Sequence, residues 1–197
     1  MMAAAASVRV TVKMEFLRMV RRLAIIVNDM LFLSQADRGA TARRSPVTSL
    51  AAELGEIIEY HEAALHDRGL SAVCDGDAKG AFDISLLRRA LSNLLSNATR
   101  YAAPGSTIRV RIESDGGRSR IWVENKGNPI EQEHLPRLFD RFYRAERSRR
   151  QVGTSNYGLG LAIVAAIARM HQGEPFARSA DGITAIGLDV PSSSAAA

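Results

Sequence analysis

This sequence contains almost no cysteine, which excludes a protein held together by disulfides. The single residue, Cys74, cannot form an internal disulfide, so a reducing compartment is acceptable. No uninterrupted apolar run reaches the roughly 18 residues that a membrane-spanning helix needs. The opening segment, residues 1–13, is too short and too interrupted to be a signal peptide. We therefore expect this chain to be soluble and cytoplasmic.

Lysine is also scarce, since only Lys13, Lys79 and Lys126 occur among 26 basic residues. The net charge of +5 therefore comes mostly from arginine. Such a balance is compatible with a nucleic acid, an acidic membrane surface or a phosphate ligand. The sequence has no basic stripe interleaved with aromatic residues and no zinc-ligand spacing, so we expect no nucleic-acid partner.

Residues from Met14 to about Ala36 have the pattern of a long bundle helix. Their apolar side chains form two adjacent stripes at three- and four-residue spacing, which gives a wide apolar face. One stripe contains Leu17, Val20, Ala24, Val27, Leu31 and Ser34, and the other contains Phe16, Met19, Leu23, Ile26, Met30 and Leu33. A lone helix of this kind would expose too much apolar surface. We expect it to pack against a partner, either within a dimer or from a missing segment.

A turn-rich, basic segment separates this helix from the rest of the chain. We therefore predict an uninformative segment at 1–13, the bundle helix at 14–38, a linker at 39–47, one domain at 48–192 and a tail at 193–197. The hydrophobic content of 46% is sufficient for one ordinary core.

Helical and strand periodicities follow one another within the predicted domain. Helices are expected at about 50–67, 83–102 and 158–173, a short helical stretch at 131–146, and strands at 106–114, 118–125, 174–180 and 183–190. Asp83 is the expected N-cap of the second helix. We expect His61 and His66 to be solvated or interfacial residues of the first helix. Helices on one face of a mixed sheet predict an α+β fold, a two-layer α/β sandwich.

The second helix of the domain carries polar side chains on one face. Asn93, Asn97, Arg100 and Tyr101 share this face by their spacing, while leucines occupy the neighbouring face. An amide oxygen suits one ligand position of Mg²⁺, a guanidinium suits phosphate oxygens, and a tyrosine ring offers a flat surface to a base. The alternative is that both asparagines merely cap or cross-link helices. This stretch alone leaves both interpretations open.

Two further stretches have the composition of ligand-binding loops. VENKGNPI, residues 123–130, places Asn125 and Gly127 after a strand, where glycine allows close backbone approach. GTSNYGLGLAIV, residues 153–164, places glycines at a helix start, where unpaired N–H groups favour phosphates. An arginine run that includes Arg144, Arg147, Arg149 and Arg150 precedes the second stretch. It is either an ordinary solvated loop or a mobile electropositive lid.

In this order and spacing, the stretches resemble the ATP-binding domain of sensor histidine kinases. NLLSNATRYA resembles the N box of that family, VENKGNPI its first glycine box, LPRLFDRFYRAE its F box, GTSNYGLGLAIV its second glycine box and GITAIGL a worn final glycine box. The resemblance covers about residues 17–191 and is greatest to the heavy-metal sensor branch. It implies the histidine kinase/gyrase/chaperone type of sandwich. It also implies that residues 14–38 are the second helix of a dimerisation and phosphotransfer hairpin.

The resemblance implies ATP and Mg²⁺ as ligands and a role for each matching residue. Asn97 would hold Mg²⁺ with support from Asn93, and Arg100 and Arg144 would contact phosphates. Asn97, Arg100 and Arg144 are thus the expected catalytic residues. The other expected nucleotide-binding residues are Tyr101, Asn125, Gly127, Ile130, Phe142, Tyr143, Tyr157, Gly158, Leu159, Gly160, Leu161 and Thr184. Among these, Tyr101 would lie against the adenine and Asn125 would accept from its amino group.

The sequence departs from the family pattern most clearly in its histidines. None of His61, His66, His134 and His171 is followed by an acid and then Arg-x-Pro, as the phosphoacceptor histidine of the family is. We therefore expect a C-terminal piece or the product of a truncated gene. It would transfer the γ-phosphoryl group to a histidine helix supplied in trans, or it would be a catalytically silent, nucleotide-binding or dimer-interfering fragment.

The resemblance also implies partners for the parent protein. We expect a homodimer or heterodimer through residues 14–38, a cognate response regulator, and an inner-membrane parent with this part in the cytoplasm. Pro129 and Asn156 replace glycines of the family pattern, so nucleotide binding is expected to survive but to be weakened. A hydrolase of the gyrase or chaperone type is disfavoured because Asn93 replaces the glutamate base. A serine kinase of the anti-sigma type fits the bundle helix less well.

Overall fold

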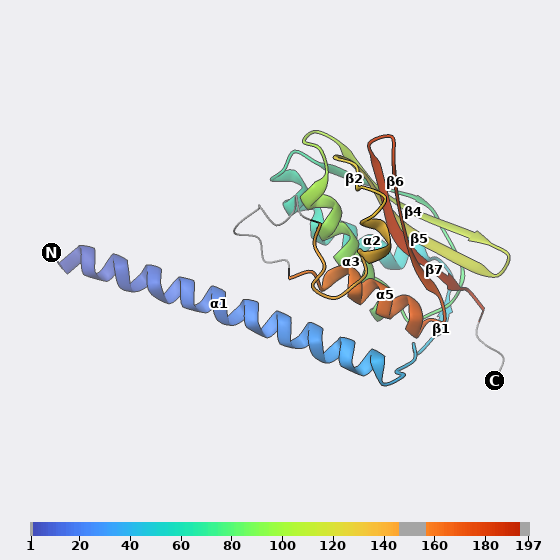
Figure 1. Ribbon diagram of the computed structural model, residues 1–197, viewed down its shortest axis with the longest axis horizontal. Coiled ribbons are helices and arrows are strands. Elements are labelled where there is room, and N and C mark those ends of the chain that lie inside the picture. Colours follow the sequence, from blue (N-terminus) through green and yellow to red (C-terminus); the bar gives the residue numbers. More distant parts are fainter. Residues whose placement is uncertain (1, 146–156, 194–197) are drawn as a thin grey trace.

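The computed structural model describes residues 2–145 and 157–193, with side chains from residue 14 onward except residue 18. Its main part is a two-layer domain from which one long helix projects (Figure 1). The N-terminal end of that helix lies far from the domain, whereas its C-terminal end lies against it (Figure 1). The predicted α+β sandwich preceded by a long helix is therefore confirmed.

One layer of the domain is a five-stranded sheet with the order β2-β4-β5-β7-β6. Its strands are β2 (Ser71–Gly76), β4 (Thr107–Asp115), β5 (Arg118–Lys126), β6 (Glu174–Ala180) and β7 (Ile183–Pro191). β2 runs parallel to β4, and the other neighbours are antiparallel. Both predicted hairpins are present. β2 was not predicted, because its side chains are mostly exposed and show no clean alternation.

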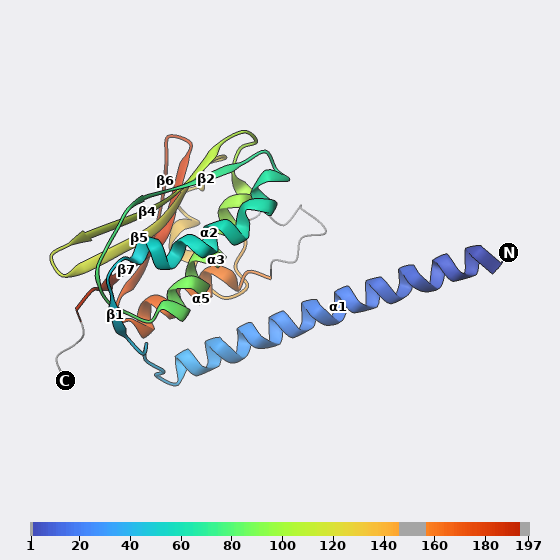
Figure 2. The same cartoon turned by 180° about the vertical axis from the view of Figure 1, so that it is seen from behind.

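The other layer consists of α2 (Leu50–His66), α3 (Ile84–Tyr101) and α5 (Gly160–Met170). All three lie on the same side of the sheet (Figure 2). Their apolar faces enclose a core with Ile108, Val110, Ile121 and other inward residues of the sheet. Asp83 caps α3 as predicted, since its side chain accepts from the amide of Leu86. The predicted helical stretch at 131–146 is shorter than expected, since its described part, residues 131–145, contains only η1 (Leu135–Arg137).

α1 spans Met2–Asp37, so the helix includes residues 2–13, for which the sequence pattern gave no prediction. Its last turns are held against the domain by Leu33, which is fully buried, and by Ile26 and Phe32 at the edge of the core. Asp29 forms an ion pair with Arg89 of α3 at 2.8 Å, and the Arg89 guanidinium lies over the Phe32 ring. The described side chains of α1 are thus mostly exposed before Ile26, whereas its last turns are part of the domain.

No helix in the described part of the chain combines the length and the apolar character that a bilayer crossing requires. α1 has the length, with 36 residues, but charged residues interrupt its apolar positions.

The segment at 39–47 is tied to the domain rather than extended from it. β1 (Ser45–Val47) pairs with β3 (Gly80–Phe82) in a separate two-stranded sheet. The amide of Arg43 donates to the Asp83 carboxylate at 2.9 Å, and the Arg44 guanidinium donates to the carbonyl oxygen of His171. Neither β1 nor β3 was predicted, since each has only three residues.

His171 joins this segment to two helices. Its ring is fully buried, with Nδ1 bonded to the carbonyl oxygen of Ile167 at 2.9 Å. Nε2 accepts from the amide of Asp83 at 3.2 Å. Because a carbonyl can only accept, Nδ1 carries the proton and the ring is neutral. Burial lowers the pKa of His171, and the nearby Arg44 adds to this, while the Ile167 carbonyl and Asp83 oppose it.

We predict that this histidine makes folding stability fall on mild acidification. The unfolded chain binds a proton below about pH 6.5, whereas the folded chain resists it, so stability is lost as pH falls through this value. His171→Gln should lower the free energy of unfolding by about 1–3 kcal/mol near pH 7.5 and should flatten its decline toward pH 5. Denaturant unfolding at several pH values measures both effects.

His66→Gln is the matched control, because His66 is exposed at the end of α2. It should keep the pH dependence of the original chain. His61 is buried between α2 and α3, and burial lowers its pKa too, so part of the decline should persist in His171→Gln. An unchanged decline in His171→Gln would contradict the prediction.

Candidate functional site

A large open cleft of about 1540 Å³ lies beside the exposed face of α3. α3 forms one wall, and the end of β5 with the loop after it forms another. η1, the segment before residue 146, the start of α5 and part of α1 complete the lining. The cleft therefore collects all three of the stretches that the sequence singled out.

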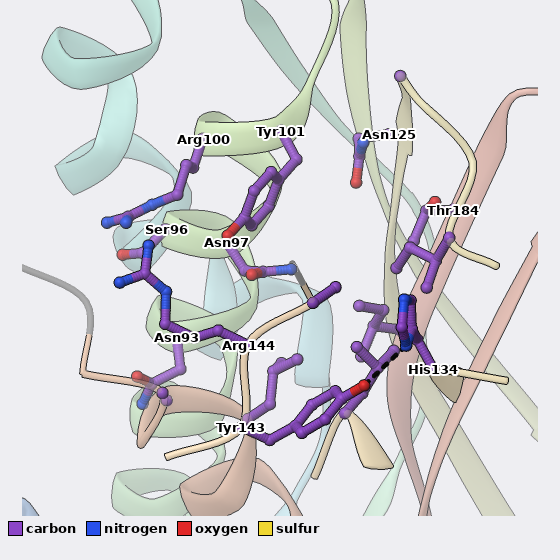
Figure 3. A pocket seen from close by; sticks show the side chains of 18 of the residues that line it. Asn93, Ser96, Asn97, Arg100, Tyr101, Asn125, His134, Tyr143, Arg144 and Thr184 are labelled. Carbon is purple, nitrogen blue, oxygen red and sulfur yellow. Dashed lines mark hydrogen bonds between the residues drawn. The ribbon is translucent and has the colours of Figure 1, made fainter. Parts of the chain in front are cut away.

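The polar face of α3 lines this cleft as its spacing predicts. Asn93, Asn97, Arg100 and Tyr101 all contribute to the wall, and Ser96 lies among them (Figure 3). On the opposite face, Leu87, Leu91, Leu94, Leu95 and Ala98 are buried in the core. The leucine face therefore fixes the direction in which the carboxamides point.

The two asparagines of α3 have different surroundings. The Asn93 side chain donates from Nδ2 to the carbonyl oxygen of Arg89 at 2.9 Å. A Cβ at Gly160 would lie 2.9 Å from Asn93 Oδ1, so the start of α5 approaches this side chain closely. Among the described residues, the Asn97 carboxamide has no hydrogen-bond partner. The alternative that the asparagines only stabilise helices thus fits Asn93. Asn97, in contrast, keeps its amide oxygen available to a ligand.

Arg100 has an unusual donor in this cleft. Its Nη1 is buried and has no hydrogen-bond partner within the part of the chain that the structure describes. Burial lowers the pKa of Arg100, and the charges of Arg144 and Arg68 lower it further, whereas Tyr101 opposes this. Arginine nevertheless stays protonated in proteins. A buried cationic donor without a partner is costly, so this end of the cleft favours an anion.

Asn125 and Thr184 lie on the other side of the cleft from Arg100 (Figure 3). Asn125 is only 5% exposed, and Ile130, Thr184 and Ile186 line the wall around it. Asn125 Nδ2 has one long contact, to the carbonyl oxygen of Lys126 at 3.4 Å. Thr184 Oγ1 lies 3.0 Å from Ser179 Oγ. Apolar walls around one amide group suit a flat heterocycle with a polar edge.

Glycine is required where the loop after β5 crosses the end of α3. A Cβ at Gly127 would lie 2.4 Å from the carbonyl oxygen of Tyr101. The same crossing includes a β-bridge between Ala102 and Gly127. This contact holds the loop after β5 against the C-terminal end of α3.

The segment that bears Arg144 is held against η1 and the residues just before α5. The Tyr143 hydroxyl is 2.8 Å from His134 Nδ1 (Figure 3), and the Arg137 guanidinium lies 4.5 Å from the centre of the Tyr143 ring. The amide of Phe142 donates to the carbonyl oxygen of Gly158 at 2.9 Å. These contacts place the F box next to the second glycine box.

The structure brings together the expected residues of the later boxes, with one exception. Tyr143, Arg144, Tyr157, Gly158, Leu159, Gly160 and Leu161 line the cleft, as do Gly127, Ile130 and Thr184. Phe142 does not line it, because its backbone is left-handed, with φ of 63°, and its side chain is 57% exposed. Arg147, Arg149, Arg150, Gly153 and Asn156 lie outside the described residues.

Several lining residues were not expected from sequence. Ser96 shares the helical spacing of Asn93 and Arg100, so the pattern contained a signal for it. Arg68 and two residues of α1, Ile25 and Asp29, also line the cleft. They have no such signal, because only the packing of distant segments brings them there.

Gly158 lies where the F box contacts the second glycine box. We predict that replacing it with alanine lowers folding stability by more than the strain of a left-handed backbone would. Gly158 has φ of +73°, and an added Cβ would lie 2.8 Å from the carbonyl carbon of Phe142. Gly158→Ala should therefore lower stability by about 2–4 kcal/mol, the sum of left-handed strain and a clash. Chemical denaturation measures this loss.

Gly105→Ala is the matched control, since Gly105 also has φ of +73° but no atom near its added Cβ. It should cost only about 1 kcal/mol, from strain alone. Equal losses in the two variants would show that the close contact at Gly158 is unimportant.

Comparison with known proteins identifies the family of this domain. Residues 82–193, more than half of the chain, match the family model described as histidine kinase-, DNA gyrase B-, and HSP90-like ATPase. The chain belongs to this family. It is also 48% identical over 153 residues to the sensor histidine kinase CusS of Escherichia coli (strain K12). That match covers 77% of this chain and 32% of CusS, so the chain spans about a third of this relative.

Solved structures show the same fold. Acinetobacter baumannii histidine kinase AdeS superposes with a TM-score of 0.75 at 21% identity, covering 89% of this chain and 81% of AdeS. Full-length ShkA in complex with AMPPNP gives a TM-score of 0.72 at 25% identity, covering 89% of this chain and 37% of ShkA. The resemblance to histidine kinases that the sequence motifs indicated is thus confirmed.

Proposed function

We propose that this chain is the catalytic domain of a sensor histidine kinase, which binds Mg-ATP and transfers its γ-phosphoryl group to a histidine of another segment. The observation that carries this proposal is the buried Nη1 of Arg100, which lies in the cleft and has no hydrogen-bond partner among the described residues. The family match and the AMPPNP complex of ShkA support a nucleotide as the occupant.

The residues of the cleft suit the parts of Mg-ATP. Asn97 would supply an amide oxygen to Mg²⁺, which neutralises phosphate charge when bound. Arg100 and Arg144 would contact phosphate oxygens, and the N–H groups at the start of α5 would add further donors. At the other end, Tyr101 would lie against the base, and Asn125 would bond its polar edge. The glycines at 158 and 160 leave the room that this approach needs.

Direct ATP hydrolysis is a weaker alternative for this site. It requires a base that accepts a proton from water, and an amide at Asn93 cannot do so. The bond from Asn93 to the carbonyl of Arg89 also directs that side chain to its own helix. Phosphoryl transfer to an incoming imidazole depends mainly on positioning and charge neutralisation, which Asn97 and the arginines offer.

Magnesium dependence tests the site directly, and we predict that Asn97→Ala removes it. Calorimetric titration of the original chain with ATP should show binding that is at least about tenfold tighter with Mg²⁺ than with EDTA. In Asn97→Ala the two affinities should be equal, because the metal loses its protein ligand, while the circular dichroism spectrum stays unchanged. Equal Mg-ATP affinity in the original chain and the variant would contradict the proposed role of Asn97.

The same variant tests the transfer step. The chain should label a phosphoacceptor hairpin from a related kinase when it is incubated with γ-labelled ATP, and the label should have the acid lability of phosphohistidine. Asn97→Ala should not label the hairpin. Tight Mg-ATP binding without any labelling would favour the silent nucleotide-binding fragment instead.

We also propose that α1 is half of a dimerisation hairpin in a membrane-anchored parent that signals to a response regulator. Both predicted stripes of α1 are largely exposed. Ile26 and Leu33 pack on the domain near the C-terminal end, whereas residues of both stripes are exposed before it: Phe16, Leu17, Met19, Val20, Leu23 and Val27. This exposed apolar surface is therefore left for a partner helix, either of a second copy or of a related kinase.

This surface predicts self-association that charge abolishes. The chain should sediment as a dimer at micromolar concentration, because two such helices bury their apolar faces together. Val20→Glu with Val27→Glu should give a monomer with the same nucleotide affinity. A monomeric original chain would show that α1 alone is not sufficient for pairing.

A further inference from the structure

Arg68 lies in the cleft although no motif of the sequence includes it. It follows α2 in the turn before β2, and its Nη2 contacts the carbonyl oxygen of Arg100 at 3.4 Å. This carbonyl belongs to the last turn of α3, where the helix dipole attracts a cation. The contact is long, so it leaves the guanidinium with donors to offer to a ligand.

Three arginines therefore lie in the same part of the cleft. Arg68 comes from the turn after α2, Arg100 from α3, and Arg144 from the segment after β5 and η1. In Figure 3 the side chains of Arg100 and Arg144 extend to the same side of the cleft, beside Ser96. Within the described residues, neither Arg68 nor Arg100 forms an ion pair. The three charges are close enough that Arg68 and Arg144 disfavour the protonated form of Arg100.

Mutual repulsion of this kind is unfavourable unless an anion relieves it. A polyphosphate carries several negative charges and enough oxygens to accept from more than one guanidinium. The buried Nη1 of Arg100 gives a second, independent indication of an anion at this place. Phosphate groups therefore suit this end of the cleft better than a base or a sugar does.

We propose that Arg68 is a phosphate-binding residue of the nucleotide site, acting together with Arg100 and Arg144. This inference rests on the proposed function, since it assigns one more residue to the same site. Unlike the residues assigned to this site from the sequence motifs, Arg68 belongs to no box of the family pattern. The residue reaches the site only because the turn after α2 packs against the end of α3.

Substitution with a matched control tests this assignment. Arg68→Gln should weaken Mg-ATP binding about 5- to 20-fold in calorimetry, because one charge-assisted phosphate contact is lost. Arg169→Gln removes the same charge from an exposed position on α5 outside the cleft, and it should stay within about twofold of the original chain. Adenosine, titrated in the millimolar range by NMR, should bind equally to all three proteins.

Thermal unfolding gives a readout that a purely structural role would not produce. Without nucleotide, Arg68→Gln should melt at the same temperature as the original chain or higher, because repulsion among the arginines is reduced. With saturating Mg-ATP, its melting temperature should rise less than that of the original chain or of Arg169→Gln.

The binding measurements distinguish a wrong assignment of Arg68 from a wrong proposed function. Equal Mg-ATP affinity in Arg68→Gln and Arg169→Gln would overturn the assignment and leave the proposed function standing. An equal loss for ATP and adenosine would also overturn it, since Arg68 would then act on the shape of the cleft. Absence of Mg-ATP binding by the original chain would instead overturn the proposed function, and this inference with it.

Discussion

The structure depends on one constraint, which is that α3 must be apolar on one face and polar on the other. Its leucines are buried against the sheet and α2, and this burial fixes the rotation of the helix about its axis. Once the rotation is fixed, Asn97 and Arg100 can only face the cleft. The orientation of the candidate ligands thus follows from hydrophobic packing on the far side of the same helix.

Close backbone approach at glycines brings the other parts of the site to α3. Gly127 lets the end of β5 reach the carbonyl of Tyr101, and Gly160 lets the start of α5 reach Asn93. Gly158 joins the F box to the second glycine box at Phe142. Each contact lies at an edge of the cleft, so the glycines determine its shape as much as the lining side chains do.

Sequence periodicity predicted the long elements well and the short ones poorly. The bounds of α3, the cap at Asp83 and both hairpins were recognisable because they repeat a strong pattern over many residues. β1, β2 and β3 were missed, since they are short or mostly exposed and their pairing is decided by partners elsewhere in the chain. The turn that puts the Phe142 side chain outside the cleft was equally invisible, because its left-handed backbone leaves no pattern in the sequence.

The sequence by itself determined the family and the fold class, and nearly all of the residues that it led us to expect at the site line the cleft. The reason is that this information lies in local motifs with fixed spacing. Only the tertiary structure decided how those residues differ. It bonded Asn93 to its own helix while leaving Asn97 available, and it buried one nitrogen of Arg100 with no partner among the residues that the structure describes. It also brought Arg68 beside them. Such differences arise from contacts between segments far apart in the chain, and no local pattern encodes those distances.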